Sequence, residues 1–152
     1  MKSVQKGGDM AGEFSQAMTG KYCGVLRWQA LDELWQRVRA EPEGWYASLV
    51  GEPPPETSLS ADALQRFVAE VDALLRREHK EDYCGIVYAD DLEAPSFIKI
   101  YDPNNLGSSC GMHGGAHPPR WVLSRLRPDA LQGAAPLPAG RKRWWQRILG
   151  MG

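Results

Sequence analysis

The sequence predicts an α+β fold, a two-layer sandwich in which about four mostly antiparallel strands carry two amphipathic helices on one face. Two stretches show apolar residues at helical spacing, and several short apolar or aromatic runs have the character of strands. The length of 152 residues and the hydrophobic content of 43% suit one domain with a single core.

The two helices are predicted from periodicity and from their end signals. The first is expected over residues 28–40, and Pro42 stops it because the residue before a proline is disfavoured in the α region. The second begins after Ser60, which suits an N-cap, and Asp62 suits its first turn. Its apolar face consists of Leu64, Phe67, Val68, Val71, Leu74 and Leu75.

The strands are expected at residues 45–50, 83–88, 97–101 and 121–126. Residues 90–95 join the second and third of these runs and are few enough to form a hairpin. We therefore predict a single α+β domain over residues 22–129. It is preceded by a mobile extension over 1–21 and followed by a Pro/Ala/Gly linker over 130–140 and a basic, tryptophan-rich tail over 141–152.

Charge is unevenly distributed along the chain. Four of the 18 basic residues follow Asp129, the last acidic residue, so the chain up to that point carries a net charge of −5 and the tail +4. An acidic body disfavours a dedicated nucleic-acid binder. The first twenty residues contain no continuous apolar run of the kind a secretory leader needs, so we expect a cytoplasmic protein with reduced thiols.

The segment 102–119 is rich in glycine and has no periodic pattern, and loops of this length are often functional. Asp102 and Asn104 suit a turn in which their side chains cap backbone amides. Asn104, Asn105, Cys110 and His113 are our candidate partner-binding residues in this loop. The plain alternative is a flexible surface loop whose cysteine and histidines have no special role.

A rival interpretation treats the same loop as a thiol or metal site. His113 near Cys110 would favour its thiolate, making Cys110 a candidate reactive thiol. Cys110, His113 and His117 are also suitable ligands for zinc or iron, with Asp102, Cys23 or Cys84 as the fourth ligand. The spacing matches no established metal motif.

Other sites have little support in the sequence. No Ser-His-Asp pattern, paired carboxylates in an apolar setting or His-Glu-x-x-His motif is present, so we assign no catalytic residue and no cofactor. Nucleotide binding is disfavoured because the glycine-rich loop runs into Pro118 and Pro119, not into a helix N-terminus.

The tail has an apolar side made of Trp144, Trp145, Ile148 and Leu149, which fall on one face of a helix. We expect the linker to carry this segment away from the domain and its tryptophans to dock on a protein partner. The alternatives are that the tail folds back on its own domain or makes weak peripheral contact with a membrane. Together, these features predict a small, non-catalytic accessory or adaptor protein that binds partners through the loop and the tail.

Overall fold

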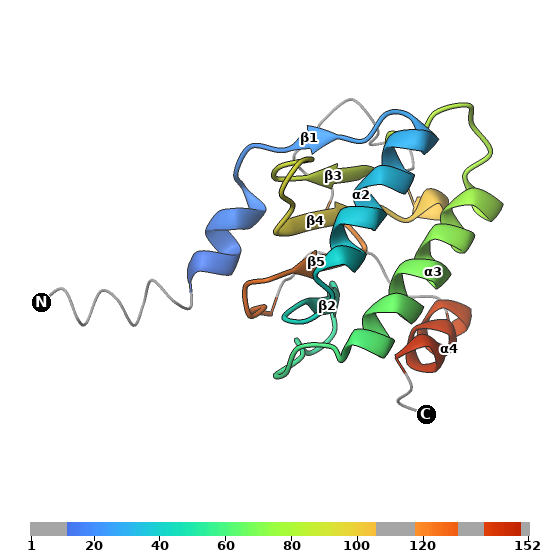
Figure 1. Ribbon diagram of the computed structural model, residues 1–152. Coiled ribbons are helices and arrows are strands. Elements are labelled where there is room, and N and C mark those ends of the chain that lie inside the picture. Colours follow the sequence, from blue (N-terminus) through green and yellow to red (C-terminus); the bar gives the residue numbers. More distant parts are fainter. Residues whose placement is uncertain (1–11, 106–117, 131–138, 150–152) are drawn as a thin grey trace, which may run out of the picture.

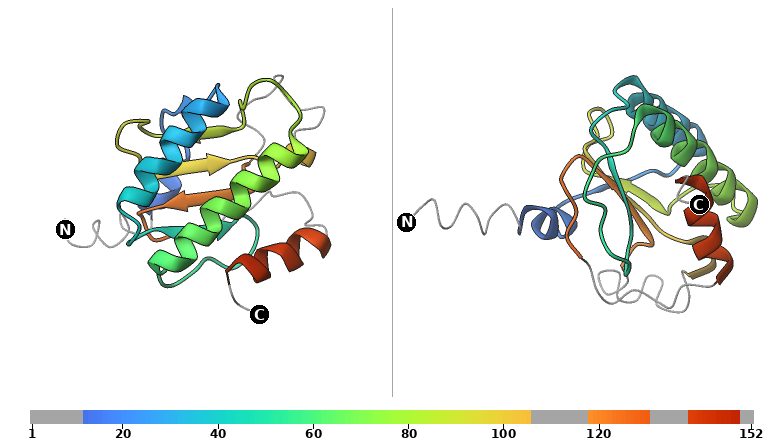
Figure 2. Two further views of the ribbon diagram at one scale, coloured as in Figure 1. Left: turned by 45° about the vertical axis from the view of Figure 1, so that its right-hand side comes forward. Right: turned by 90° about the horizontal axis from the view of Figure 1, so that it is seen from below.

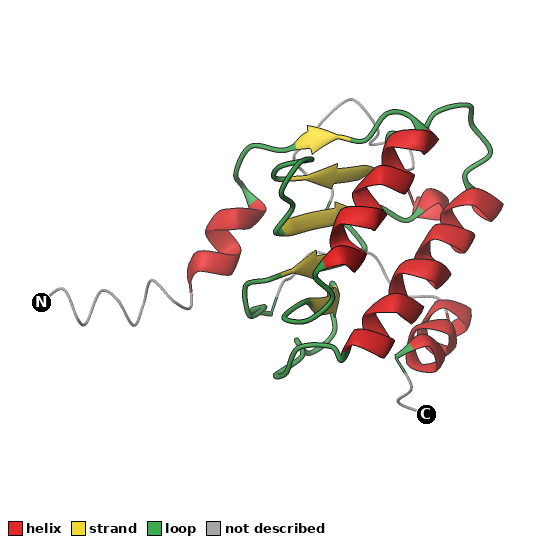
Figure 3. Cartoon of the chain, viewed as in Figure 1, coloured by secondary structure: helices red, strands yellow, loops and turns green. Residues whose placement is uncertain are grey.

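The computed structural model of the chain describes residues 12–105, 118–130 and 139–149 (Figure 1). In chain order these form β1 (Cys23–Gly24), α2 (Trp28–Ala40), β2 (Tyr46–Leu49), α3 (Ala61–Glu78), β3 (Val87–Ala89), β4 (Phe97–Ile100), the 3-10 turn η1 (Pro103–Asn105), β5 (Trp121–Ser124) and α4 (Ala139–Ile148). A further short helix over residues 12–18 precedes β1 (Figure 3).

The five strands form one antiparallel sheet in the order β1-β3-β4-β5-β2. Helices α2, α3 and α4 lie on the same face of this sheet (Figure 2). The predicted α+β class is confirmed, with five strands in place of about four. The additional strand is β1, in which Cys23 pairs with Ala89 and Gly24 with Tyr88. Two residues are too few to show a periodic pattern in a sequence.

The two predicted helices form where their patterns indicate. Helix α2 spans Trp28–Ala40, as expected, and buries Leu31, Leu34, Trp35 and Val38. Helix α3 begins after Ser60, whose side chain accepts a hydrogen bond of 3.1 Å from the backbone N–H of Ala63. Such an N-cap satisfies one of the amides that the first turn of a helix leaves without an intrahelical partner.

Strand β3 begins four residues later than the sequence suggests. Gly85 has a φ of +70°, in the left-handed region that favours glycine. A Cβ at this position would lie 2.9 Å from the Tyr83 ring. The chain therefore bends at Gly85, and regular pairing with β4 starts at Val87.

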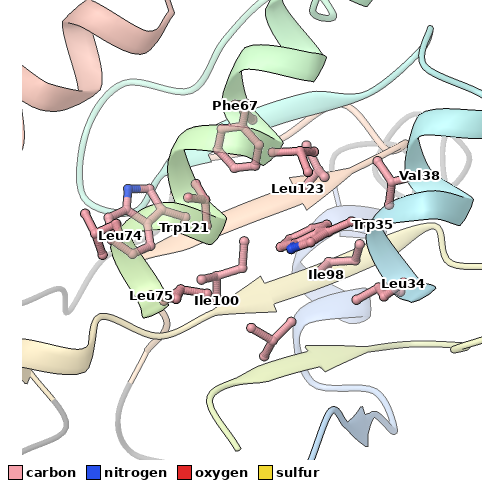
Figure 4. Packing of buried hydrophobic residues seen from close by; sticks show 14 of the residues in the cluster. Leu34, Trp35, Val38, Phe67, Leu74, Leu75, Ile98, Ile100, Trp121 and Leu123 are labelled. Carbon is pink, nitrogen blue, oxygen red and sulfur yellow. The ribbon is translucent and has the colours of Figure 1, made fainter. Parts of the chain in front are cut away.

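The main core lies between the sheet and the helices. Side chains of α2 and α3 meet Ile98 and Ile100 from β4 and Trp121 and Leu123 from β5 (Figure 4). All four of these strand residues have no exposed surface. Because successive residues of a strand point to opposite faces, Phe97 and Val122 are left on the other side of the sheet.

A smaller cluster covers that second face. Phe14, from the helix over residues 12–18, is completely buried and its ring lies 5.2 Å from that of Phe97. Val50 and Val122 complete the cluster. Within the extension that the sequence predicts to be mobile, 1–21, residues 12–18 thus form a helix packed on the sheet, and residues 1–11 lie outside the described part of the chain. Phe14, Ala17 and Met18 share one side of this helix, but a single turn of apolar spacing is too short to predict a helix from the sequence.

Candidate functional site at the loop root and the C-terminal helix

Helix α4 packs on the domain that precedes it. Trp144, Trp145 and Ile148 are 7%, 8% and 1% exposed and belong to the main core, and Leu149 packs against the same core. The expectation that residues 130–140 carry the tail away from the domain is therefore wrong for α4. The chain adopts the alternative in which the tail folds back.

The helical spacing of these side chains explains the packing. Positions 144, 145 and 148 fall on one side of the helix, which faces α3 and β5. The Trp144 ring lies 5.5 Å from that of Trp121, and the Trp145 ring meets Phe67 edge-on at 5.9 Å. Aromatic pairs at such distances add to the gain from burial.

Arg141 fixes the first turn of α4 to two other parts of the molecule. Its Nε and Nη2 atoms each donate a hydrogen bond of 2.9 Å to the carboxylate of Asp102, just after β4. Nη2 also donates to Glu78 Oε1, at the end of α3, over 2.7 Å. This bidentate contact with Asp102 is the geometry in which a guanidinium binds a carboxylate most strongly.

Asp102 is the centre of this junction, because its side chain is only 4% exposed and its carboxylate accepts hydrogen bonds from both Arg141 and the Asn104 backbone. One carboxylate oxygen accepts a 2.9 Å hydrogen bond from the backbone N–H of Asn104, which forms the turn expected from the sequence. Arg120 forms a longer ion pair with the same carboxylate, with its Nε 3.7 Å from Asp102 Oδ2. The Asn104 side chain donates to Glu78 Oε1.

The junction favours the charged forms of its acids and of Arg141. Burial alone would raise the pKa of Asp102, but the hydrogen bonds from Arg141 and Asn104 and the charge of Arg120 hold it below its usual value. Hydrogen bonding to Arg141 lowers the pKa of Glu78. The same bonds raise the pKa of Arg141. Groups shifted in these directions stay ionised near neutral pH, so they are suited to holding segments together and not to transferring protons.

The junction also anchors both ends of the loop. Asp102 and η1 lie at its start, and the backbone N–H of Arg120, just beyond its end, donates a 3.0 Å hydrogen bond to Ile100 O. The two segments that the sequence marks as candidate contact regions, 102–119 and the tail, therefore meet at one cluster of charges.

The predicted site residues divide into three groups. Asn104 lies in the junction, and Asn105 lies in η1 with its side chain outside the described part. Cys110, His113 and His117 fall within residues 106–117, which the structure does not describe. Trp144, Trp145, Ile148 and Leu149 contact the core of their own domain.

The two cysteines named as alternative fourth ligands lie in different environments. Cys23 is exposed at β1, whereas Cys84 is buried and has a thiol pKa raised by that burial. Among the residues that the structure describes, no three His, Cys, Asp or Glu side chains are grouped so that they could hold a metal ion.

Sequence reasoning missed the role of Glu78 and the pairing of Asp102 with Arg141. The partners of Arg141 are 39 and 63 residues away along the chain. No local pattern indicates contacts over such separations. The only available signal was the placement of Arg141 at the start of an amphipathic segment.

A comparison with protein-family models, curated protein sequences and solved structures finds no match. None of the helices in the described ranges is both long and apolar enough to cross a membrane.

Proposed function

We propose that this chain is a small, non-catalytic accessory protein of the cytoplasm that binds a protein partner through the 102–119 loop and the C-terminal tail. The observation that carries this proposal is the Arg141 junction, where the root of the loop and the first turn of α4 are held against the end of α3. A partner that contacts the loop near its root can therefore contact α4 as well.

Because the tail folds back on its own domain, only some of its side chains are accessible to a partner. The tryptophans and Ile148 pack in the core of the domain, so within the described part of the tail the solvent-facing side of α4 is open to a contact. A rigid helix beside a loop favours binding because little conformational freedom is lost when the complex forms.

The charges of the junction support a binding role over a catalytic one. Asp102 and Glu78 are both held by Arg141, and their pKa values are moved further from neutrality. A general acid or base needs a pKa near the working pH. The described part of the site holds charged side chains and backbone groups in fixed positions, which suits the recognition of a partner protein.

Quantitative affinity purification of the tagged full chain tests the proposal. The loop variant is Cys110→Ser with His113→Ala, and the control is Glu33→Gln with Glu56→Gln, two exposed acids elsewhere. We expect a stoichiometric protein partner with the wild type and the control, and its loss with the loop variant at an unchanged thermal midpoint. Equal recovery with all three chains would contradict a role for the loop.

The rival interpretation, a thiol or metal protein centred on Cys110, gives a different result in the same preparation. Elemental analysis of the purified wild type would then show about one zinc or iron per chain, and the loop variant would lose it. Finding that metal would overturn the accessory-protein proposal.

A further inference from the structure

The outer face of α4 carries a cluster of exposed positive charges. Lys142, Arg143, Gln146 and Arg147 are all exposed, and their spacing places them on the side opposite the buried tryptophans. We call the three cations Lys142, Arg143 and Arg147 the basic face of α4. Helix α4 contains no acidic residue.

The basic face has no carboxylate partner within the described residues. Three exposed or half-exposed arginines on α2 and α3 do have one: Arg37 pairs with Glu93, Arg76 with Asp32 and Asp72, and Arg77 with Glu78. By contrast, the acids beside α4, Asp102 and Glu78, are engaged by Arg141.

Helix α3 contributes a further positive charge at the C-terminal end of α4. Figures 1 and 2 show α3 and α4 packed beside each other. Arg66 of α3 donates a 3.1 Å hydrogen bond to the carbonyl oxygen of Ile148, at the C-terminal end of α4. A cation suits this end of a helix, and among the described residues no carboxylate forms an ion pair with Arg66.

We propose that the basic face of α4 binds an acidic segment of the partner protein, one rich in Asp and Glu. This inference rests on the proposed function and specifies the chemistry of the partner. Two of the three cations are arginines, which bind carboxylates through two parallel hydrogen bonds. The chain itself uses this geometry between Arg141 and Asp102.

A membrane fits these observations less well. Interfacial helices place aromatic and aliphatic side chains among the lipids and cations above them. In α4 the apolar side is occupied by the core of its own domain, so three cations alone would hold the protein to a bilayer. Such attraction is weak and strongly screened by salt.

Nucleic acid is also a poorer fit. Binding to phosphates gains affinity from each cation that displaces a counterion, and a small basic face displaces few. The chain before the tail carries a net charge of −5, which repels an extended polyanion along its whole length. A short acidic segment contacts only the surface of α4.

The first test uses a fluorescein-labelled, glutamate-rich peptide as probe and measures its anisotropy with the full chain. The test variant is K142Q/R143Q/R147Q. The control is K21Q/R39Q/K80Q, which removes three exposed cations far from α4 in the sequence and changes the net charge equally. Glutamine, lysine and arginine have similar helix propensities, so α4 should persist in the test variant.

We expect the test variant to bind the peptide at least about tenfold more weakly than the wild type, and the control within about twofold. Equal loss with both variants would mean that only net charge matters and would overturn the inference. So would tighter binding of phosphatidylserine vesicles or of a DNA duplex through the same three residues at about 0.15 M salt.

The second test separates this inference from the proposed function. The K142Q/R143Q/R147Q chain is used as bait in the affinity purification described above. Reduced recovery of the partner supports both statements. Full recovery with this chain, together with loss in the Cys110→Ser, His113→Ala variant, would overturn the acidic-segment inference and leave the accessory function standing.

Discussion

At the scale of single residues, Arg141 is the side chain on which the position of α4 depends. Its removal would leave Asp102 buried, charged and without its main hydrogen-bond donor. Removing one partner of a buried ion pair destabilises a protein by more than the intact pair stabilises it. The remaining charge is still shielded from water and no longer has an opposite charge beside it. We expect Arg141→Met to destabilise the protein by about 3 kcal/mol.

Urea unfolding measures this effect, and Lys142→Met is the matched control. Lys142 is the next residue and is exposed, so its substitution should change the free energy of unfolding by less than about 0.5 kcal/mol. Similar values for the two variants would mean that the junction contributes little to stability.

The same junction predicts a dependence of stability on pH. The pKa values of Asp102 and Glu78 are lowered in the folded protein. A lowered pKa stabilises the folded state fully above the pKa of the unfolded carboxyl, about 4. This stabilisation is lost as the pH falls through the lower, folded-state values.

The stability difference between the wild type and Arg141→Met should therefore be largest near pH 7 and shrink as the pH falls below about 4. Urea titrations at a series of pH values measure it. In an Asp102→Asn background the acid-dependent part of the difference should be smaller. A difference that stays constant between neutral and acid pH would contradict the assigned role of these carboxylates.

At the scale of elements, α4 is part of the domain and not an appendage. Ending the chain at residue 138 would expose Phe67 and Trp121, against which its tryptophans pack. We expect this truncated chain to bind the dye ANS and to melt at a markedly lower temperature than the full chain. Q146A, on the exposed side of α4, should behave like the wild type. An unchanged melting temperature after truncation would mean that α4 contributes nothing to the core.

This packing also decides which experiment can test the function of the tail. Deleting residues 141–152 would remove core side chains, so a lost interaction would not distinguish a missing contact from a damaged fold. Substitutions confined to Lys142, Arg143 and Arg147 leave the buried side of α4 intact and avoid this problem.

The elements that could be predicted from sequence are those specified by local patterns. Helix α3 shows six apolar residues at helical spacing and a capping serine, and both features act within a few turns of the helix. The apolar side of α4 was predicted for the same reason. The position of α4 against α3 was not predicted, because the contact of Trp145 with Phe67 joins distant parts of the chain.

The candidate site divides in the same way. The cap that the Asp102 side chain provides for the Asn104 backbone is local and was predicted from the residue types, whereas the bond from the Asn104 side chain to Glu78 was not. The bonds from Arg141 to Asp102 and Glu78 depend on how α3, α4 and β4 pack, and burial of the carboxylate is what makes them strong. Local sequence patterns indicate which face of a helix is buried, but not how distant elements pack together or that a carboxylate between them is buried.

At the scale of the whole molecule, the sheet is covered on both faces by unequal layers. Three helices cover one face, whereas the helix over residues 12–18 supplies the described cover of the other. Phe14 anchors that helix against Phe97. Lys99 adds a second attachment, since its ammonium donates to Met18 O and lies 4.0 Å from the centre of the Tyr22 ring.

The two layers should respond independently to substitution, because they lie on opposite sides of a continuous sheet. We expect Phe14→Ala to cost about 3 kcal/mol and to speed amide hydrogen exchange in residues 12–18. Exchange in α4 should change only as far as global stability falls. Glu13→Ala is the control because Glu13 is exposed. Hydrogen exchange measured by mass spectrometry would contradict this separation if Phe14→Ala loosened α4 as much as the N-terminal helix.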